Sequence, residues 1–198
     1  MDYQIKIDDR KLLYKGFLKL ESLKLNHALF GGGWSDNLER ELISRHDAVA
    51  VLLYDPKQHQ VVLIEEFRIG AIADTKSAWL VELVAGYCED NESLIEVMHR
   101  ELMEEAGLKV NRHEEILAFY SNPGICSDKV TLLCAEVDAT KAGGVHGLTS
   151  EGEDIRVGVY AFDEVMQLLK EGFFQSPSPI IALQWLQLNY QRLRQVWQ

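Results

Sequence analysis

Three glutamates, Glu101, Glu104 and Glu105, lie close together in the middle of the chain. Residues three or four positions apart occupy neighbouring parts of one face of an α-helix. Like charges so placed repel each other by about 0.2–0.5 kcal/mol per pair, and carboxylates near a helix C-terminus also oppose its dipole. A hard divalent ion that binds carboxylate and phosphate oxygens would offset this repulsion. The three residues therefore suit a phosphate-handling metal site, although glutamates on an arbitrary helix are usually only solvated.

The surrounding residues have the pattern of an amphipathic helix. Its apolar positions follow i, i+3 and i+4 spacing, at Leu94, Val97, Met98 and Leu102. Asp90 or Asn91 is expected to cap its start, and Gly107 its end. Arg100 and Glu92 are interpreted as scaffold residues, because an arginine holds carboxylates in place through bidentate hydrogen bonds. No second histidine follows His99 at zinc-protease spacing, so His99 is interpreted as an ordinary helix residue.

These features belong to a longer pattern over residues 86–108, G-x5-E-x7-R-E-U-x-E-E-x-G-U, in which U is aliphatic. The specified positions are Gly86, Glu92, Arg100, Glu101, Leu102, Glu104, Glu105, Gly107 and Leu108. This spacing resembles the signature of the Nudix hydrolases. The resemblance implies an α/β fold, the Nudix α/β/α sandwich with a mixed β-sheet between helices.

The resemblance also implies roles for individual residues. Glu101 and Glu105 match the helix ligands of Mg2+, with Mn2+ left open, and Glu104 matches a lesser or shared ligand. Ala85, in the string ELVAG, resembles the residue that presents a backbone carbonyl to the metal.

The general base is expected on a loop before a late strand. Glu151, in SEGED, matches that position, and Glu153 matches a metal ligand or an alternative base. The loop contains several glycines and a serine, which would let it close over a substrate.

Three further features resemble the bacterial ADP-ribose pyrophosphatase branch of this family. The first is a proline, Pro123, fifteen residues beyond Leu108. The other two are the strings VHGLTSEGEDIRV (Val145–Val157) and IALQWLQL (Ile181–Leu188). They imply metal-dependent hydrolysis of ADP-ribose to AMP and ribose 5-phosphate, by water attack on the diphosphate. GDP-mannose, another nucleoside diphosphate sugar, or a dinucleotide is the alternative substrate. A sensor that binds ADP-ribose without cleaving it is the alternative from a different class, but sensors typically lose signature carboxylates that this chain keeps.

Candidate substrate-binding residues also come from the resemblance. In this branch, certain positions contact the phosphates and the ribose of the substrate, and the arginines of this chain that lie nearest to those positions are Arg40, Arg45 and Arg68. Phe17 resembles an aromatic residue that packs on adenine. Asp128 stands where a longer glutamate is expected, which puts one polar substrate contact in doubt. Arginine suits phosphate because its planar fork donates two hydrogen bonds, although each arginine could equally form a surface ion pair.

Composition limits the class of protein. The 198 residues are 47% hydrophobic and 26% charged, which is ordinary for a globular enzyme. The net charge of −11 argues against a nucleic-acid surface. A charged N-terminus and the lack of a long apolar run predict a cytoplasmic protein without a membrane segment. Three cysteines without a CxxC pair argue against disulfides and structural zinc.

The order of predicted elements suggests two parts. Residues 1–45 form a strand-rich, antiparallel N-terminal extension, expected to serve dimerisation, and residues 46–198 form the Nudix hydrolase domain. Strands are expected at residues 39–45, 48–54, 61–67, 80–84, 116–120, 130–137 and 155–160, and further helices near 163–172 and 179–196. The family resemblance implies a homodimer in which a second subunit helps to form the substrate site.

Overall fold

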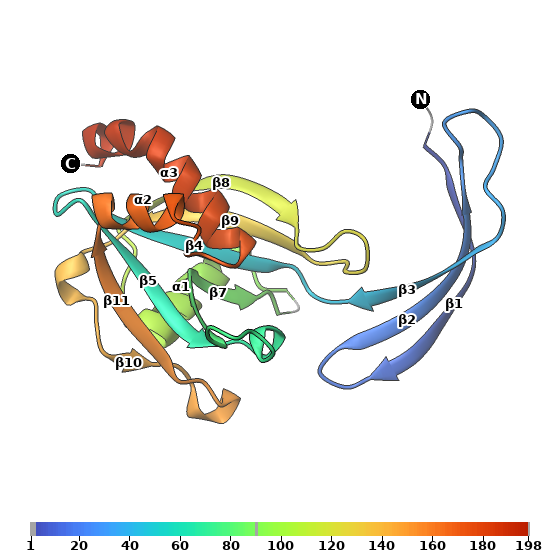
Figure 1. Cartoon of the computed structure of the whole chain (residues 1–198), viewed down its shortest axis with the longest axis horizontal. Coiled ribbons are helices and arrows are strands. Elements are labelled where there is room, and N and C mark those ends of the chain that lie inside the picture. Colours follow the sequence, from blue (N-terminus) through green and yellow to red (C-terminus); the bar gives the residue numbers. More distant parts are fainter. Residues whose placement is uncertain (1–2, 90, 198) are drawn as a thin grey trace. The chain divides into compact units, whose positions relative to one another are not determined.

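The computed structural model describes residues 3–89 and 91–197, and the chain divides into two compact units. Unit 1 comprises Met1–Asp47 and Tyr120–Lys129, and unit 2 comprises Ala48–Phe119 and Val130–Gln198. Each unit has its own sheet (Figure 1).

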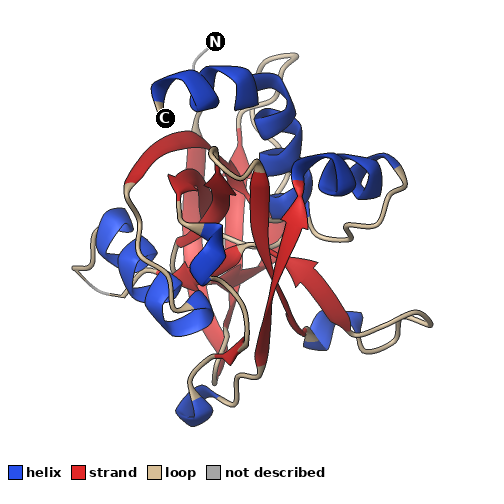
Figure 2. Cartoon of the chain, turned by 90° about the vertical axis from the view of Figure 1, so that its left-hand side faces the viewer, coloured by secondary structure: helices blue, strands red, loops and turns tan. Residues whose placement is uncertain are grey.

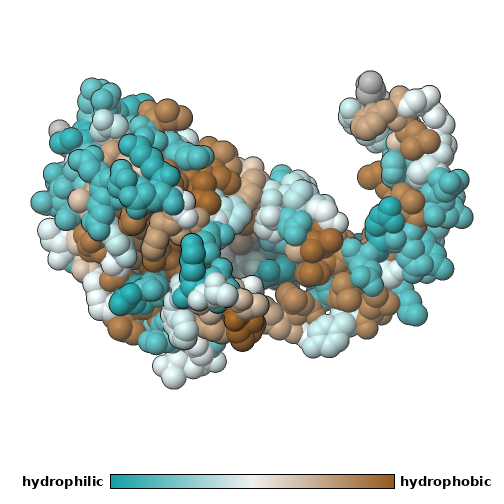
Figure 3. Space-filling model, viewed as in Figure 1, coloured by the Kyte–Doolittle hydropathy of each residue, from teal (hydrophilic) through white to brown (hydrophobic). Residues whose placement is uncertain are grey.

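Unit 1 is an antiparallel three-stranded sheet, as expected for the strand-rich N-terminal extension. Its strands, in the order β1-β2-β3, are β1 (Ile5–Lys15), β2 (Lys19–His27) and β3 (Leu38–Ser44). The loop of residues 120–129 is bonded to β3, where the Ile43 N–H donates to the Ile125 carbonyl at 2.8 Å. Every residue of β1 is exposed, and Figure 3 shows apolar side chains at the surface of this sheet.

Unit 2 contains an eight-stranded mixed sheet. The strands are β4 (Ala48–Asp55), β5 (Gln60–Phe67), β6 (Trp79–Glu82), β7 (Val84–Tyr87), β8 (Arg112–Tyr120), β9 (Lys129–Glu136), β10 (Val145–His146) and β11 (Ile155–Ala161). Their order is β10-β11-β5-β4-β9-β8, with β6 paired to β5 and β7 to β4. The β4–β9 ladder is parallel and β4–β5 is antiparallel, so the expected mixed sheet is confirmed.

Helices cover both faces of this sheet (Figure 2). Alternate residues of β4 point to opposite sides. Val49 and Val51 pack in the core beneath α1 (Leu94–Ala106), whereas Ala50 and Leu52 pack with α2 (Phe162–Lys170) and α3 (Pro177–Val196). Three short 3-10 helices lie at Ile69–Ala71, Ala139–Lys141 and Thr149–Glu151. No helix in the described ranges is long and apolar enough to cross a membrane.

The start of α1 differs from the prediction. Its N-cap is Ser93, whose hydroxyl accepts from the Glu96 N–H while the Glu96 carboxylate accepts from the Ser93 N–H. This reciprocal capping box satisfies two backbone donors, which a cap by Asn91 would not do. Asn91 instead has a positive φ of 70°, and Asp90 lies outside the described residues. The predicted end is confirmed, because Gly107 caps the helix in the left-handed conformation, at φ 64°.

The single strand predicted at residues 80–84 is two short strands. β4 and β5 pair directly only from Leu53–Asp55 to Gln60–Val62, and beyond that point they separate. β6 then pairs with β5 and β7 pairs with β4. The β6–β7 segment therefore fills the gap between diverging strands, and it brings the residues before the signature helix against the centre of the sheet.

Candidate active site

The carboxylates of α1 are buried at its packed face. Glu101 and Glu105 are 8% and 4% exposed, and Glu104 is half-buried. Burial disfavours the charged form, and it raises the pKa of Glu101 to about 7 and that of Glu105 to about 9. The Ala85 N–H donates to Glu105 Oε2 at 3.0 Å, which opposes the shift at Glu105. The prediction that these acids are concentrated on one helix face agrees with their packing.

Gly86 allows the close approach of β7 to α1. A Cβ at this position would lie 1.6 Å from Glu101 Oε1, so no other residue fits without moving that carboxylate. Gly86 pairs with Val49 in the β4–β7 ladder, which fixes its backbone. Sterics therefore explain why the signature has a glycine at this position, because any larger residue would overlap the Glu101 carboxylate.

Arg100 acts as a scaffold, as predicted. Its Nε and Nη2 donate to the two oxygens of Glu92 at 3.0 Å each, a bidentate pair. Its Nη1 donates to Glu101 Oε1 at 2.6 Å and to Glu104 Oε2 at 3.3 Å. Arg100 thus offsets part of the repulsion between the α1 carboxylates, but Glu105 lies outside this set of bonds.

The loop that carries the two candidate bases is tied to the end of α1. The Gly147 N–H donates to the Glu104 carbonyl at 3.0 Å, and the Leu148 N–H donates to Glu153 Oε2 at 2.9 Å. Glu153 is half-buried, and its negative charge contributes to the raised pKa of both Glu101 and Glu105. Glu151 is exposed in the short 3-10 helix of this loop.

Glu66 is a member of this carboxylate cluster that the sequence analysis missed. It is 8% exposed, burial raises its pKa to about 7, and the charge of Glu153 adds to the shift. Arg68 partly counters this shift, since its Nη2 lies 2.6 Å from Glu66 Oε1. A signal was present in the string VVLIEEF, because strand alternation places Glu66 on the same face as the core residue Ile64.

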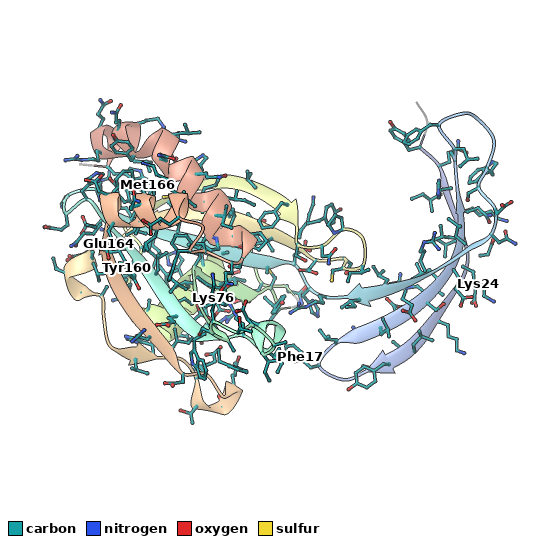
Figure 4. All side chains as sticks on the ribbon, in the orientation of Figure 1. Phe17, Lys24, Lys76, Tyr160, Glu164 and Met166 are labelled. Atoms are coloured by element: carbon teal, nitrogen blue, oxygen red, sulfur yellow. The ribbon has the colours of Figure 1, made fainter. Side chains whose placement is uncertain are left out.

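The other predicted substrate residues belong to unit 1. Phe17 is 91% exposed in the turn between β1 and β2, and Figure 4 labels its ring at that turn. Arg40 is exposed on β3, where its Nη1 donates to the Glu39 carbonyl. The Arg45 N–H donates to Ser127 Oγ at 3.1 Å. Asp128 is 3% exposed, and within the described chain its Oδ1 has no hydrogen-bond partner.

The residues at the β7–α1 contact fit a divalent cation. Glu101 and Glu105 are both buried acids, Arg100 compensates only Glu101, and no ion pair of Glu105 is formed within the described residues. The missing Cβ of Gly86 lets the Glu101 carboxylate lie against the β7 backbone. No three acidic, histidine or cysteine side chains of the described residues converge into a complete ligand set. A cation here would therefore take further ligands from backbone carbonyls, water and phosphate oxygens.

Comparisons with known proteins identify the family of this chain. The NUDIX domain matches residues 44–183, and the chain therefore belongs to the Nudix hydrolase family. The chain is 42% identical to the ADP-ribose pyrophosphatase of Escherichia coli K12 over 193 residues, which cover 98% of this chain and 92% of that protein. It is 41% identical to the ADP-ribose pyrophosphatase of Haemophilus influenzae, with 98% and 90% coverage.

More distant relatives include a second named activity. The GDP-mannose pyrophosphatase of Cronobacter sakazakii is 32% identical, over 76% of this chain and 78% of that protein. A solved structure described as an ADP compounds hydrolase superposes with a TM-score of 0.68 at 20% identity, covering 94% of this chain and 96% of that one. This likeness supports the α/β fold with its mixed sheet.

Proposed function

We propose that this protein hydrolyses ADP-ribose to AMP and ribose 5-phosphate, with Mg2+ as its cofactor. The observation that carries the proposal is the pair of buried acids, Glu101 and Glu105, which pack against the Ala85–Gly86 backbone. Buried carboxylates with raised pKa values need a cation to be charged at neutral pH, and a diphosphate needs a cation to be attacked. The names of the two most similar relatives described above support ADP-ribose as the substrate.

In the proposed reaction, water attacks a phosphorus of the diphosphate, and the bridging P–O bond breaks. Glu101, Glu105 and the Ala85 carbonyl would hold Mg2+, with Glu104 as a lesser or shared ligand. The ion would neutralise the diphosphate and lower the pKa of the attacking water. Glu151 takes the proton of that water, while Glu153 is a metal ligand or the alternative base. Arg100 keeps Glu101 and Glu104 in place through its bonds to both.

Substrate recognition is assigned to arginines and one aromatic residue. Arg40, Arg45 and Arg68 would bind phosphate and ribose oxygens, since a guanidinium donates paired hydrogen bonds. Phe17 would pack on adenine, and its almost complete exposure leaves its ring available. Asp128 is the remaining candidate for a polar substrate contact, and its buried Oδ1 has no hydrogen-bond partner among the described residues.

We further propose that residues 1–45 serve as a dimerisation extension to a Nudix domain of residues 46–198, in a cytoplasmic homodimer. The support is the exposure of apolar side chains on unit 1, where Ile5, Ile7 and Tyr14 are 70%, 54% and 60% exposed. Exposed apolar patches on a small sheet are typical of interaction surfaces.

GDP-mannose is the alternative substrate, favoured by the 32% identity to a GDP-mannose pyrophosphatase. A panel of ADP-ribose, GDP-mannose, NADH and diadenosine polyphosphates, with products followed by chromatography, separates these possibilities. We expect the highest kcat/KM for ADP-ribose. A higher value for GDP-mannose would overturn the substrate assignment, and binding of ADP-ribose without cleavage would favour a sensor.

A further inference from the structure

The guanidinium of Arg68 is held by two acidic side chains from neighbouring strands. Its Nε donates to Glu82 Oε2 at 2.6 Å, and its Nη2 lies 2.6 Å from both Glu82 Oε2 and Glu66 Oε1. The contact with Glu66 is an ion pair without hydrogen-bond geometry, so Glu82 is the main partner. The third nitrogen, Nη1, makes no hydrogen bond within residues 3–89 and 91–197. One edge of the guanidinium is therefore fixed, and donors on the other edge stay available.

Strand register explains why these three residues meet. In the antiparallel β5–β6 ladder, Glu82 is opposite Ile64 and Glu66 is opposite Leu80, so the two acids are diagonal neighbours on one face. The Arg68 N–H donates to the Ala78 carbonyl at 2.8 Å, which extends the ladder by one residue. Alternation then places the Arg68 side chain on the same face as Glu66.

This face is the one that carries the α1 carboxylates. Ile64 packs in the core beneath α1. Burial lowers the pKa of Arg68, but the charges of Glu82, Glu66 and, to a lesser extent, Glu105 raise it above its usual value. The Arg68 side chain is nevertheless 40% exposed, and it lines an open depression together with Asp74 and Gln175. A guanidinium that served only as an internal ion-pair partner would not need an exposed edge beside a depression.

We propose that Glu82, assisted by Glu66, is a positioning residue that holds Arg68 ready to bind a phosphate of the substrate. An arginine side chain loses much rotational freedom when it binds a ligand, and fixing it beforehand reduces that cost. The two acids thus contribute to substrate affinity through Arg68 without touching the substrate. This inference rests on the proposed function, since it requires a diphosphate substrate.

The test is a double-mutant cycle between Glu82 and Arg68, read in kcat, KM and thermal stability. We expect Glu82→Gln to raise the KM for ADP-ribose about 10-fold in the wild-type background and to leave kcat within about threefold. Combined with Arg68→Ala, the same substitution should change KM less than about twofold, because the residue that it positions is gone. Glu66→Gln provides a second cycle if Glu82→Gln does not fold.

Glu114→Gln is the matched control, because Glu114 pairs with Arg192 in another ion pair of unit 2. We expect this control to leave KM unchanged. Additive effects of Glu82→Gln and Arg68→Ala on KM, or a loss of thermal stability with unchanged KM, would overturn the positioning role. Every variant is also assayed with the best substrate of the panel. A preference for another nucleotide sugar would refute the substrate assignment, but the coupling between Glu82 and Arg68 could still be measured with that substrate.

Discussion

At the scale of residues, the site is defined by buried glutamates, whose charged forms cost folding free energy because they are removed from water. Glu66, Glu101 and Glu105 are each less than a tenth exposed, and desolvation is the largest cause of the raised pKa of each. Burial of their charged forms costs stability, and within the described chain arginines pair only with Glu66 and Glu101 of these three. We interpret the arrangement as a site whose stability depends on a bound cation.

This interpretation predicts how stability depends on pH in the metal-free protein. The pKa of Glu105 is raised from 4.5 to about 9, so the folded state binds more protons than the unfolded state between these values. Its stabilising contribution is complete below pH 4.5 and is lost as the pH rises through about 9. In excess chelator, the melting temperature should therefore fall between pH 5 and pH 9, and Glu105→Gln should reduce that fall. Thermal unfolding of both proteins measures this, with Glu115→Gln on exposed β8 as the control, and equal slopes would count against it.

Glu151 and Glu153, the two glutamates of the loop before β11, are predicted to differ in their effects on kinetics. A positioned general base contributes roughly 10²–10⁴-fold, so Glu151→Gln should lower kcat by about that factor with little change in KM or metal affinity. The charge of Glu153 contributes to the raised pKa of the α1 carboxylates Glu101 and Glu105. Glu153→Gln should instead raise the Mg2+ concentration that gives half the maximal rate. Steady-state rates at varied Mg2+ separate these effects. Near-normal kcat in Glu151→Gln, with loss of activity in Glu153→Gln at saturating Mg2+, would exchange the two roles.

At the scale of elements, the site depends on the contact between β7 and α1. The strand approaches the helix so closely that Glu101 occupies the volume where a Gly86 side chain would be. Separation of β4 from β5 creates the position that β7 fills. The geometry of the sheet and the conformation of one carboxylate are therefore coupled.

Gly86→Ala tests this coupling. The added methyl group should displace the Glu101 carboxylate, lowering kcat at least about 10-fold and weakening Mg2+ affinity, because active-site groups must be held within fractions of an ångström. Gly31→Ala is the matched control, since a Cβ there meets no atom within 4 Å. Activity and metal titrations should distinguish the two variants, and wild-type kinetics in Gly86→Ala would show that the contact tolerates a methyl group.

Much of this arrangement could be predicted from the sequence because short-range patterns encode it. Spacing within α1 predicted the shared face of Glu101 and Glu105, and Gly107 predicted the helix end. The division of residues 80–84 between two strands could not be predicted, because it depends on where β4 and β5 separate. Glu66 was missed for a related reason: only tertiary packing brings it near the charge of Glu153.

At the scale of the whole molecule, unit 1 differs from unit 2 because few of its apolar side chains are buried. Unit 2 has extensive cores on both faces of its sheet, whereas β1 is exposed along its entire length. A three-stranded sheet with exposed apolar side chains gains stability when another surface covers it. This imbalance motivates the proposed homodimer.

Oligomeric state provides the corresponding prediction. We expect sedimentation equilibrium to give twice the mass of one chain for the wild type. Ile5→Lys combined with Ile7→Lys should shift the protein towards monomers, because two charges would enter the proposed interface. Leu188→Lys on α3, where the side chain is 85% exposed, is the control and should leave the mass unchanged. A monomeric wild type would contradict the proposed dimer.

We propose that Glu105 and its neighbours hold a divalent cation for diphosphate hydrolysis. The decisive measurement is the rate of ADP-ribose hydrolysis by the wild type and by Glu105→Gln, each with saturating Mg2+ and with excess chelator. We predict turnover only for the wild type with Mg2+, and a loss in Glu105→Gln of at least about 100-fold without a change in secondary structure. Undiminished hydrolysis by the variant, or by the wild type in chelator, would show that Glu105 does not hold a catalytic cation.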